Sequence, residues 1–561
     1  MTPGRSRPGA GARWCGVLIG LASACSEPAS RERTLPSASA SPAVTAAPRV
    51  TPRPRVAAAD AAVAPADPGA ALDVDPRVGT PGLLEDPSGV ALLPLYRALA
   101  LLDSGAAARV GIVQLGDSLT AGDFQTSVMR QRLQARFGDA GRGWLLPGKP
   151  IKHYYLGDAQ YGSEGKWDVE YGMKRTAIEP VGLGGVRIHS GSTKVSSWVS
   201  TCSRCNAGKT ASHIELWYRR TPESGTLTFT VDDGTPEKLP MRLPRGAPPE
   251  GTQSHVIVVP DGAHKLTLRP LGDGVVDLFA VIMERGEPGI VLDAIGVVGA
   301  QATHLERWDW TWVGEQLARR APSLVVLAYG TNEIDDDGLD LARFEARLVE
   351  LVRRIKVAVP DAAVLIQGPP DRGQRELGRK ECEKVEKKGK GGKQRGKKGK
   401  RLSKRERERV RVMLPAGVVR PGCEWKTAAS LAGIIAAERS AAERSGAAFY
   451  DVFTAMGGAD RSDLLLHQEP KWFYKDHVHF ATAGGTFVAA HLLQDLMARY
   501  EAWRVRRGLP APLRSANPPW PPVPVLPTAP MPTVPPTPAT PATPGPTPAT
   551  PGPTPSAAKA R

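Results

Sequence analysis

The stretch VQLGDSLTAGD, residues 113–123, decides how the chain is interpreted. An apolar run stops at Gly116, and Asp117 and Ser118 follow where a chain would leave a buried strand. An Asp–Ser pair at the start of a helix is more often a cap than a catalytic pair. Whether Ser118 is a nucleophile therefore depends on what the rest of the chain supplies.

Five short segments rich in β-branched residues have the composition of strands that are buried on both faces of a sheet. They are VGIVQL, VLDAIGVV, SLVVLAY, AAVLIQG and AAFYDVF. Helical patterns separate several of them, and the clearest places one apolar stripe on a helix. That stripe consists of Leu341, Phe344, Leu348, Leu351, Val352 and Ile355. Strands that alternate with helices predict a three-layer α/β/α domain with a parallel sheet.

Residues 151–288 interrupt this α/β pattern. They contain segments in which apolar and polar residues alternate, separated by Asp-Gly turns, as in GTLTFTVDDG, and they lack a helical pattern. We expect an inserted all-β sandwich domain, since a compact β domain can have its two ends close together. Trp198, Trp217 and Tyr218 are candidates to stack on sugar rings. Aromatic side chains at strand positions more often belong to a core, however.

Four separated blocks carry the side chains of a serine hydrolase: GDSLT, GVVGAQ, YGTNE and KDHVHF. Residues just past the carboxyl ends of parallel strands converge on one crevice. There His479 can take the proton of Ser118, and Asp476 can orient the imidazole. The backbone N–H groups of Ser118 and Gly299 and the side-chain amide of Asn332 are candidates for an oxyanion hole. This chemistry needs no metal and no organic cofactor.

These residue types in this order resemble the SGNH, or GDSL, hydrolase family over about residues 79–150 and 289–500. The resemblance implies a flavodoxin-like sheet with Ser118 as nucleophile. His477 is a competing base, but His479 has the family spacing from Asp476. One departure is Glu333, because an aspartate commonly follows the asparagine of the third block.

A narrower resemblance joins GDSLTAGDFQTSVMRQRLQARFGDAGRGWLLPGKP, the β insertion, and AMGG with DHVHF. Together they look like the periplasmic peptidoglycan O-acetylesterases, which remove acetyl groups from the muramic acid 6-hydroxyl. In those proteins the insertion resembles a carbohydrate-binding module. Leu119 stands where many of these relatives have a histidine, and the basic stretch 372–411 looks added.

The N-terminus has the features of an export signal. Arg5, Arg7 and Arg13 precede WCGVLIGLASAC, which has the length of a signal-peptide apolar region and is too short to span a bilayer. The end of this segment resembles a lipobox with Cys25 as the lipidated residue, although Leu21 lies one place further away than usual. A cell-envelope lipoprotein, in the periplasm or anchored to the outer membrane, is expected; an ordinary secretory signal is the alternative.

Four cysteines remain after the signal, and export favours disulfides between them. The Cys202–Cys205 motif lacks the second CxxC of a zinc site. Three pairings are open, and we favour Cys202 with Cys205 and Cys382 with Cys423.

The formal net charge of +16 comes mainly from residues 372–411, which contain nineteen Lys or Arg and six Glu. A charge run of this kind is usually solvated, so we expect a flexible surface insertion and no nucleic-acid partner. Contact with anionic envelope components is the alternative.

The chain is thus expected to contain six segments: a signal peptide, a disordered Ala/Pro/Ser linker, two parts of the hydrolase domain around the insertion, and a Pro-rich tail. Their predicted bounds are 1–25, 26–78, 79–150, 151–288, 289–505 and 506–561. The expected function is an exported serine esterase that removes O-acetyl groups from a polysaccharide, with peptidoglycan favoured. An O-acetyltransferase with the same residues and a non-catalytic wall-binding lipoprotein are the alternatives.

Overall fold

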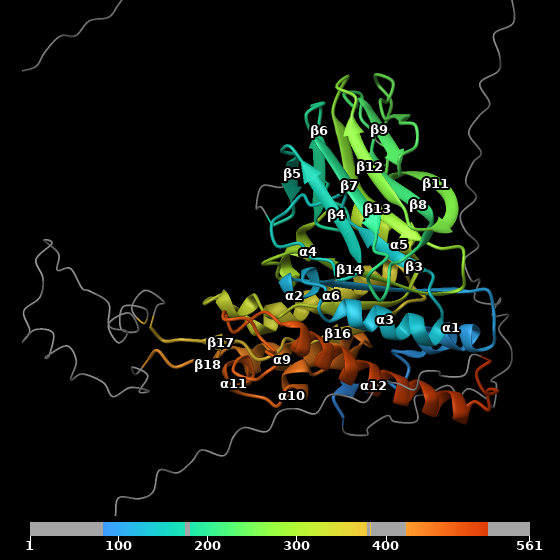
Figure 1. Cartoon of the computed structure of the whole chain (residues 1–561). Coiled ribbons are helices and arrows are strands. Elements are labelled where there is room, and N and C mark those ends of the chain that lie inside the picture. Colours follow the sequence, from blue (N-terminus) through green and yellow to red (C-terminus); the bar gives the residue numbers. More distant parts are fainter. Residues whose placement is uncertain (1–81, 174–179, 249, 378–381, 383–421, 514–561) are drawn as a thin grey trace, which may run out of the picture. The chain divides into compact units, whose positions relative to one another are not determined.

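The computed structural model describes residues 82–173, 180–248, 250–377, 382 and 422–513 (Figure 1). The predicted signal, Cys25, the linker, most of the basic stretch and the tail beyond residue 513 lie outside these residues. No helix within the described ranges is both long and apolar enough to cross a membrane.

The five predicted strands form one parallel sheet, in the order β19-β16-β15-β2-β14. A sixth strand at the edge, β1, runs antiparallel to β19 and was not predicted, because two residues are too short for a pattern. The strands are β1 (Leu84–Glu85), β2 (Arg109–Gly116), β14 (Gly289–Gly296), β15 (Pro322–Ala328), β16 (Ala363–Gln367) and β19 (Ala448–Tyr450).

Alternate side chains of β2 enter two different cores, which confirms the three-layer architecture. Val113 and Leu115 pack on the side of α5, α6 and α9, whereas Val110 and Ile112 pack on the side of α1, α3 and α12. These helices are α1 (Leu93–Asp103), α3 (Thr126–Phe137), α5 (Trp310–Arg320), α6 (Leu341–Ala358), α9 (Leu431–Ser445) and α12 (Thr482–Arg506).

The predicted apolar stripe of α6 is buried except at its first position. Leu341 is 39% exposed, and it is the first residue of the helix. The stripe lies on this helix as predicted, and its buried part begins at Phe344.

The inserted domain consists of two antiparallel sheets, which confirms the predicted all-β insertion. One sheet has the order β10-β9-β12-β7-β4, and the other has the order β11-β8-β13-β6-β5 with β3 paired to β13. Because β3 belongs to this domain, the described sandwich starts before residue 151. The strands are β3 (Gly141–Leu145), β4 (Ala159–Glu164), β5 (Asp168–Tyr171), β6 (Val186–Ser190), β7 (Ser196–Thr201), β8 (Ala211–Arg219), β9 (Thr226–Val231), β10 (Glu237–Pro240), β11 (Gln253–Gly262), β12 (Lys265–Pro270) and β13 (Val276–Glu284).

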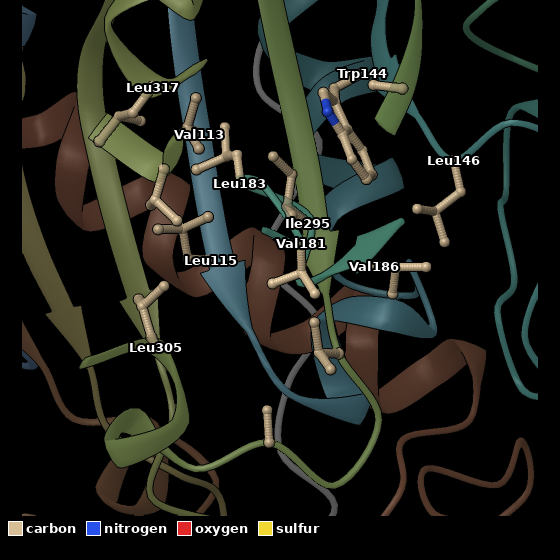
Figure 2. Packing of buried hydrophobic residues seen from close by; sticks show 14 of the residues in the cluster. Val113, Leu115, Trp144, Leu146, Val181, Leu183, Val186, Ile295, Leu305 and Leu317 are labelled. Carbon is tan, nitrogen blue, oxygen red and sulfur yellow. The ribbon is translucent and has the colours of Figure 1, made fainter. Parts of the chain in front are cut away.

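The insertion shares its core with one face of the parallel sheet. Figure 2 shows Trp144 and Val186 of the insertion in the same cluster as Leu115 and Ile295 of β2 and β14. Because apolar side chains pack continuously between them, the two domains are joined by a shared core.

Two of the three aromatic residues considered for sugar stacking belong to the core. Trp217 is 1% exposed and Tyr218 is 7% exposed, so neither presents a ring face to a ligand. Trp198 is half-buried on β7, beneath Lys265 Nζ at 4.9 Å from the ring centroid.

The structure joins Cys202 to Cys205 and Cys382 to Cys423, the pairing favoured from the sequence.

A buried cluster of four charges also joins the two domains. Asp123 and Arg130 come from the segment after Ser118, and Arg142 and Asp158 come from the insertion. Each arginine contacts both aspartates, and all four side chains are at most 2% exposed. The charges balance, so removing one of them leaves an uncompensated buried charge.

We therefore expect Arg130→Met to lower the free energy of unfolding by about 3–5 kcal/mol, measured by urea denaturation. Arg353→Met is the matched control, because Arg353 pairs with Glu350 on the exposed face of α6 and should change little. A wild-type unfolding midpoint for Arg130→Met would contradict the role assigned to the cluster.

Candidate active site

Ser118 is the first residue of the short helix α2 (Ser118–Ala121), directly beyond β2. Asp117 is the N-cap, and its Oδ1 accepts a hydrogen bond from Leu119 N at 2.8 Å. Capping is therefore done by Asp117 and leaves the hydroxyl of Ser118 available. Leu119, in the place of the histidine of many relatives, packs against the core beneath α1 and α3.

Two glycines let α2 lie directly on the ends of the strands. A Cβ at Gly116 would lie 2.7 Å from Ala328 O, and one at Gly296 would lie 2.7 Å from Asp117 O. Neither position has room for a side chain. The close approach brings the start of α2 level with the ends of β14 and β15.

The fourth block places an imidazole against Ser118. His479 Nε2 lies 2.8 Å from Ser118 Oγ, and His479 Nδ1 lies 2.8 Å from Asp476 Oδ2. Asp476 Oδ1 also accepts hydrogen bonds from the backbone N–H groups of Val478 at 3.1 Å and His479 at 3.0 Å. The structure thus connects Ser118, His479 and Asp476 by hydrogen bonds in one chain.

These contacts set the charge states of the pair. The hydrogen bond to Asp476 raises the pKa of His479 and outweighs the burial that opposes it. Burial alone would raise the pKa of Asp476, but hydrogen bonds from the His479 ring and from two backbone N–H groups lower it to about 2. Asp476 is therefore ionised and stabilises the imidazolium form of His479.

The competing base, His477, has different surroundings. It is 3% exposed, adopts a φ of 60°, and stacks on Trp425 with 3.8 Å between ring centroids. Its Nδ1 lies 3.5 Å from Asp463 Oδ1, and its carbonyl accepts a hydrogen bond from Gly373 N at 3.1 Å. His477 thus supports the loop, and His479 is the histidine that faces Ser118.

The other two blocks meet beside Ser118. Gly299 has a φ of 79° in a turn closed by Ala300 N and Val297 O at 2.9 Å. In the part of the chain that the structure describes, the backbone N–H groups of Ser118 and Gly299 have no hydrogen-bond acceptor. Both donors are available to a ligand atom.

The side-chain amide of Asn332 is already engaged. Its Nδ2 donates to Ala300 O at 2.9 Å and to Asp117 Oδ2 at 3.2 Å. Burial raises the pKa of Asp117 to about 6, although hydrogen bonds and the nearby His479 and Arg372 charges lower it in part. To act as an oxyanion donor, Asn332 has to exchange one of these two contacts.

Glu333, the departure from the family pattern, links two blocks. Its Oε1 accepts from Ala302 N at 2.8 Å and its Oε2 from Gly330 N at 3.0 Å. Burial raises the pKa of Glu333 to about 7. This role is not predicted from the sequence, although a carboxylate directly after Asn332 is a visible signal.

Arg372 corrects the interpretation of the basic stretch as solvated throughout. Its guanidinium donates to Thr331 O at 2.6 Å and to both carboxylate oxygens of Asp335 at 2.6 and 2.8 Å. Its charge lowers the pKa of His479 in part. The first residues of the stretch are folded against the catalytic edge because specific acceptors pair with Arg372, which charge counting does not reveal.

With this geometry in place, comparison with known proteins identifies the class. Residues 271–485 match the GDSL-like lipase/acylhydrolase family, a span that includes Gly299, Asn332, Asp476 and His479. Ser118 precedes the span. No curated protein matches the chain. Residues 271–485 thus form a GDSL-like lipase/acylhydrolase domain, and the fold and the site of the described residues are those of an SGNH-type esterase.

A solved structure entitled "Peptidoglycan O-acetylesterase in action" is similar over 75% of this chain and 100% of its own, with 26% identity and a TM-score of 0.55. Family two carbohydrate esterases from Clostridium thermocellum and Cellvibrio japonicus are 12% and 10% identical. They cover 61% and 64% of this chain and 100% and 98% of their own, with TM-scores of 0.23 and 0.21. These low scores carry no weight for function.

The acidic limb of the pH profile tests the His479–Asp476 bond. If His479 is the general base it must be neutral to act, so its raised pKa predicts that kcat/KM falls as pH drops through a value above the usual histidine pKa. In Asp476→Asn the carboxylate that stabilises the imidazolium is lost, so this limb should shift to lower pH while kcat falls. An unshifted limb in a folded Asp476→Asn protein would contradict the assignment.

Asn332→Ala tests the third block. If the side-chain amide of Asn332 replaces its hydrogen bond to Asp117 with one to the oxyanion, removing that amide should lower kcat on an aryl acetate by about 10²–10³-fold with little change in KM. Gln160→Ala, on β4 of the inserted domain, is a control for general effects of substitution. If kcat on the aryl acetate stays within about twofold of wild type, the backbone N–H groups of Ser118 and Gly299 are sufficient as oxyanion donors.

Proposed function

We propose that this chain is an exported serine esterase that removes O-acetyl groups from peptidoglycan. The observation that carries the proposal is the hydrogen-bonded chain Ser118–His479–Asp476 beside two unoccupied backbone donors. The similarity to the solved peptidoglycan O-acetylesterase, which extends over all of that protein, supports the substrate.

The geometry supports a reaction in two stages. Ser118 Oγ attacks the acetyl carbonyl carbon while His479 Nε2 takes its proton. The oxyanion that forms accepts hydrogen bonds from Ser118 N, Gly299 N and Asn332 Nδ2. His479 then gives the proton to the sugar oxygen, the ester bond breaks, and an acetyl group remains on Ser118.

Water completes the reaction by the same route. His479 removes a proton from water, the resulting hydroxide attacks the acetyl carbonyl, and acetate leaves as the proton returns to Ser118. A sugar hydroxyl in place of water would make the protein an acetyltransferase. Acetylated glycan formed from mixed donor and unmodified glycan would identify that reaction.

Export and membrane attachment through a lipid on Cys25 belong to the same proposal. The basic run before WCGVLIGLASAC and the two disulfides support an oxidising compartment outside the cytoplasm. The basic stretch after Arg372 provides the charge for contact with anionic envelope components.

The rate of acetate release from acetylated substrates tests the proposed function directly. Wild-type protein should release acetate from O-acetylated peptidoglycan faster than from acetylated xylan, and it should also hydrolyse an aryl acetate. Ser118→Ala should lower kcat on every substrate by on the order of 10⁴–10⁶-fold, because the attacking atom is gone.

The control is Ser212→Ala, on β8 of the inserted domain, which should retain wild-type rates. Full aryl-acetate activity in Ser118→Ala would overturn the esterase mechanism. Binding of peptidoglycan without turnover by wild type would instead point to a wall-binding lipoprotein.

A further inference from the structure

Two aromatic side chains stand apart from the rest of the molecule. Among the Phe, Trp and Tyr residues that the structure describes, Tyr155 at 48% and Tyr474 at 49% are the two that are exposed. All the others are buried or half-buried. An aromatic ring left in solvent loses the benefit of burial, and such rings commonly mark recognition surfaces.

One tyrosine is hydrogen-bonded through its backbone to the helix that begins with Ser118, and the other to His479 itself. Tyr155 N donates to Ala121 O, the last residue of the helix that begins with Ser118, at 3.1 Å. Tyr474 N donates to His479 O at 2.8 Å. The Tyr474 ring also lies 6.0 Å from the ring of Phe124, which follows α2.

A lysine accompanies Tyr155. Lys149 Nζ lies 5.3 Å from the ring centroid of Tyr155 and 5.8 Å from that of Tyr161. Within the described ranges, Lys149 Nζ has no carboxylate at ion-pair distance. Arg372, another cation near the site, is paired with Asp335. Lys149 is thus held over aromatic rings while its charge stays uncompensated.

We propose that Tyr155, Tyr474 and Lys149 form the glycan-binding subsite of the esterase, and that this subsite selects carboxylate-bearing glycans over neutral ones. The inference rests on the proposed function and extends it to substrate choice. The tyrosine rings offer flat faces for sugar rings next to the acetylated unit. Lys149 offers its ammonium to a carboxylate on the same chain, whereas a neutral glycan lacks the group that Lys149 would bind.

The alternative platform is on the inserted sandwich. Trp198 and Lys265 form a similar aromatic–cation pair at 4.9 Å, but they lie on β7 and β12. In the described structure the Trp198 ring packs over Gly162 of β4 and makes no hydrogen bond to α2 or to the loop of His479. This pair matches the proposed subsite in chemistry and differs in position, which makes it the control.

Kinetics on three substrates separate the roles. Tyr155→Ala and Tyr474→Ala should each raise KM for O-acetylated peptidoglycan about 3- to 10-fold, a larger change than for an aryl acetate. Lys149→Gln should raise KM for acetylated peptidoglycan about 2- to 5-fold at low salt, less at high salt, and not for acetylated xylan. Trp198→Ala and Lys265→Gln should keep wild-type constants.

Binding to a dead enzyme makes the test independent of turnover. Ser118→Ala protein should bind soluble de-O-acetylated peptidoglycan fragments in calorimetry, and adding Tyr155→Ala or Lys149→Gln should weaken that binding. Equal KM and equal affinity in these variants, or a loss confined to Trp198→Ala, would overturn the subsite. Absence of aryl-acetate hydrolysis by wild type would instead overturn the proposed function and leave the binding result to stand alone.

Discussion

Three neighbouring parallel strands end at the same level of the sheet, and the site depends on this alignment. Gly116 of β2 is in register with Gly296 of β14 on one side and with Ala328 of β15 on the other. The residues that follow these three ends are therefore delivered to one edge: Ser118, Gly299 and Asn332. A shift of one residue in any strand would turn its side chains to the opposite face and misplace the block that follows. The glycines at 116 and 296 matter for the same reason, since a side chain at either would push α2 away from this edge.

The inserted sandwich contributes to this edge from outside the sheet. Its shared core with β2 and β14 and the buried Asp123–Arg130–Arg142–Asp158 cluster fix it against the segment that carries Ser118. Gly157 N of the insertion also donates to Asp123 Oδ2 at 3.0 Å. The domain is thus coupled to the segment of Ser118 through buried charge and packing. It places Tyr155 next to α2, with Lys149 over the Tyr155 ring. An insertion with this attachment shapes the site directly.

The sequence predicted the parallel sheet, the inserted β domain and the four blocks because each leaves a local pattern. Apolar runs mark β2, β14 and β15, and polar residues follow them at their ends. Contacts between distant residues leave no such pattern. Trp217 and Tyr218 look like other strand aromatics until packing shows them buried. Arg372 is hidden in a charge run, Asn332 is engaged by Asp117 across the fold, and the tie between Tyr155 and Ala121 depends on how the insertion docks.

The proposed mechanism requires that Ser118 carries the acetyl group of the substrate during turnover. The direct measurement is peptide mapping by mass spectrometry after rapid acid quench of the protein during turnover of O-acetylated peptidoglycan. One added acetyl group is expected on the peptide that contains Ser118. It should be absent in Ser118→Ala and absent with de-O-acetylated glycan. Acetate release without any acetylated Ser118 peptide, or an acetyl group that maps to another residue, would contradict it.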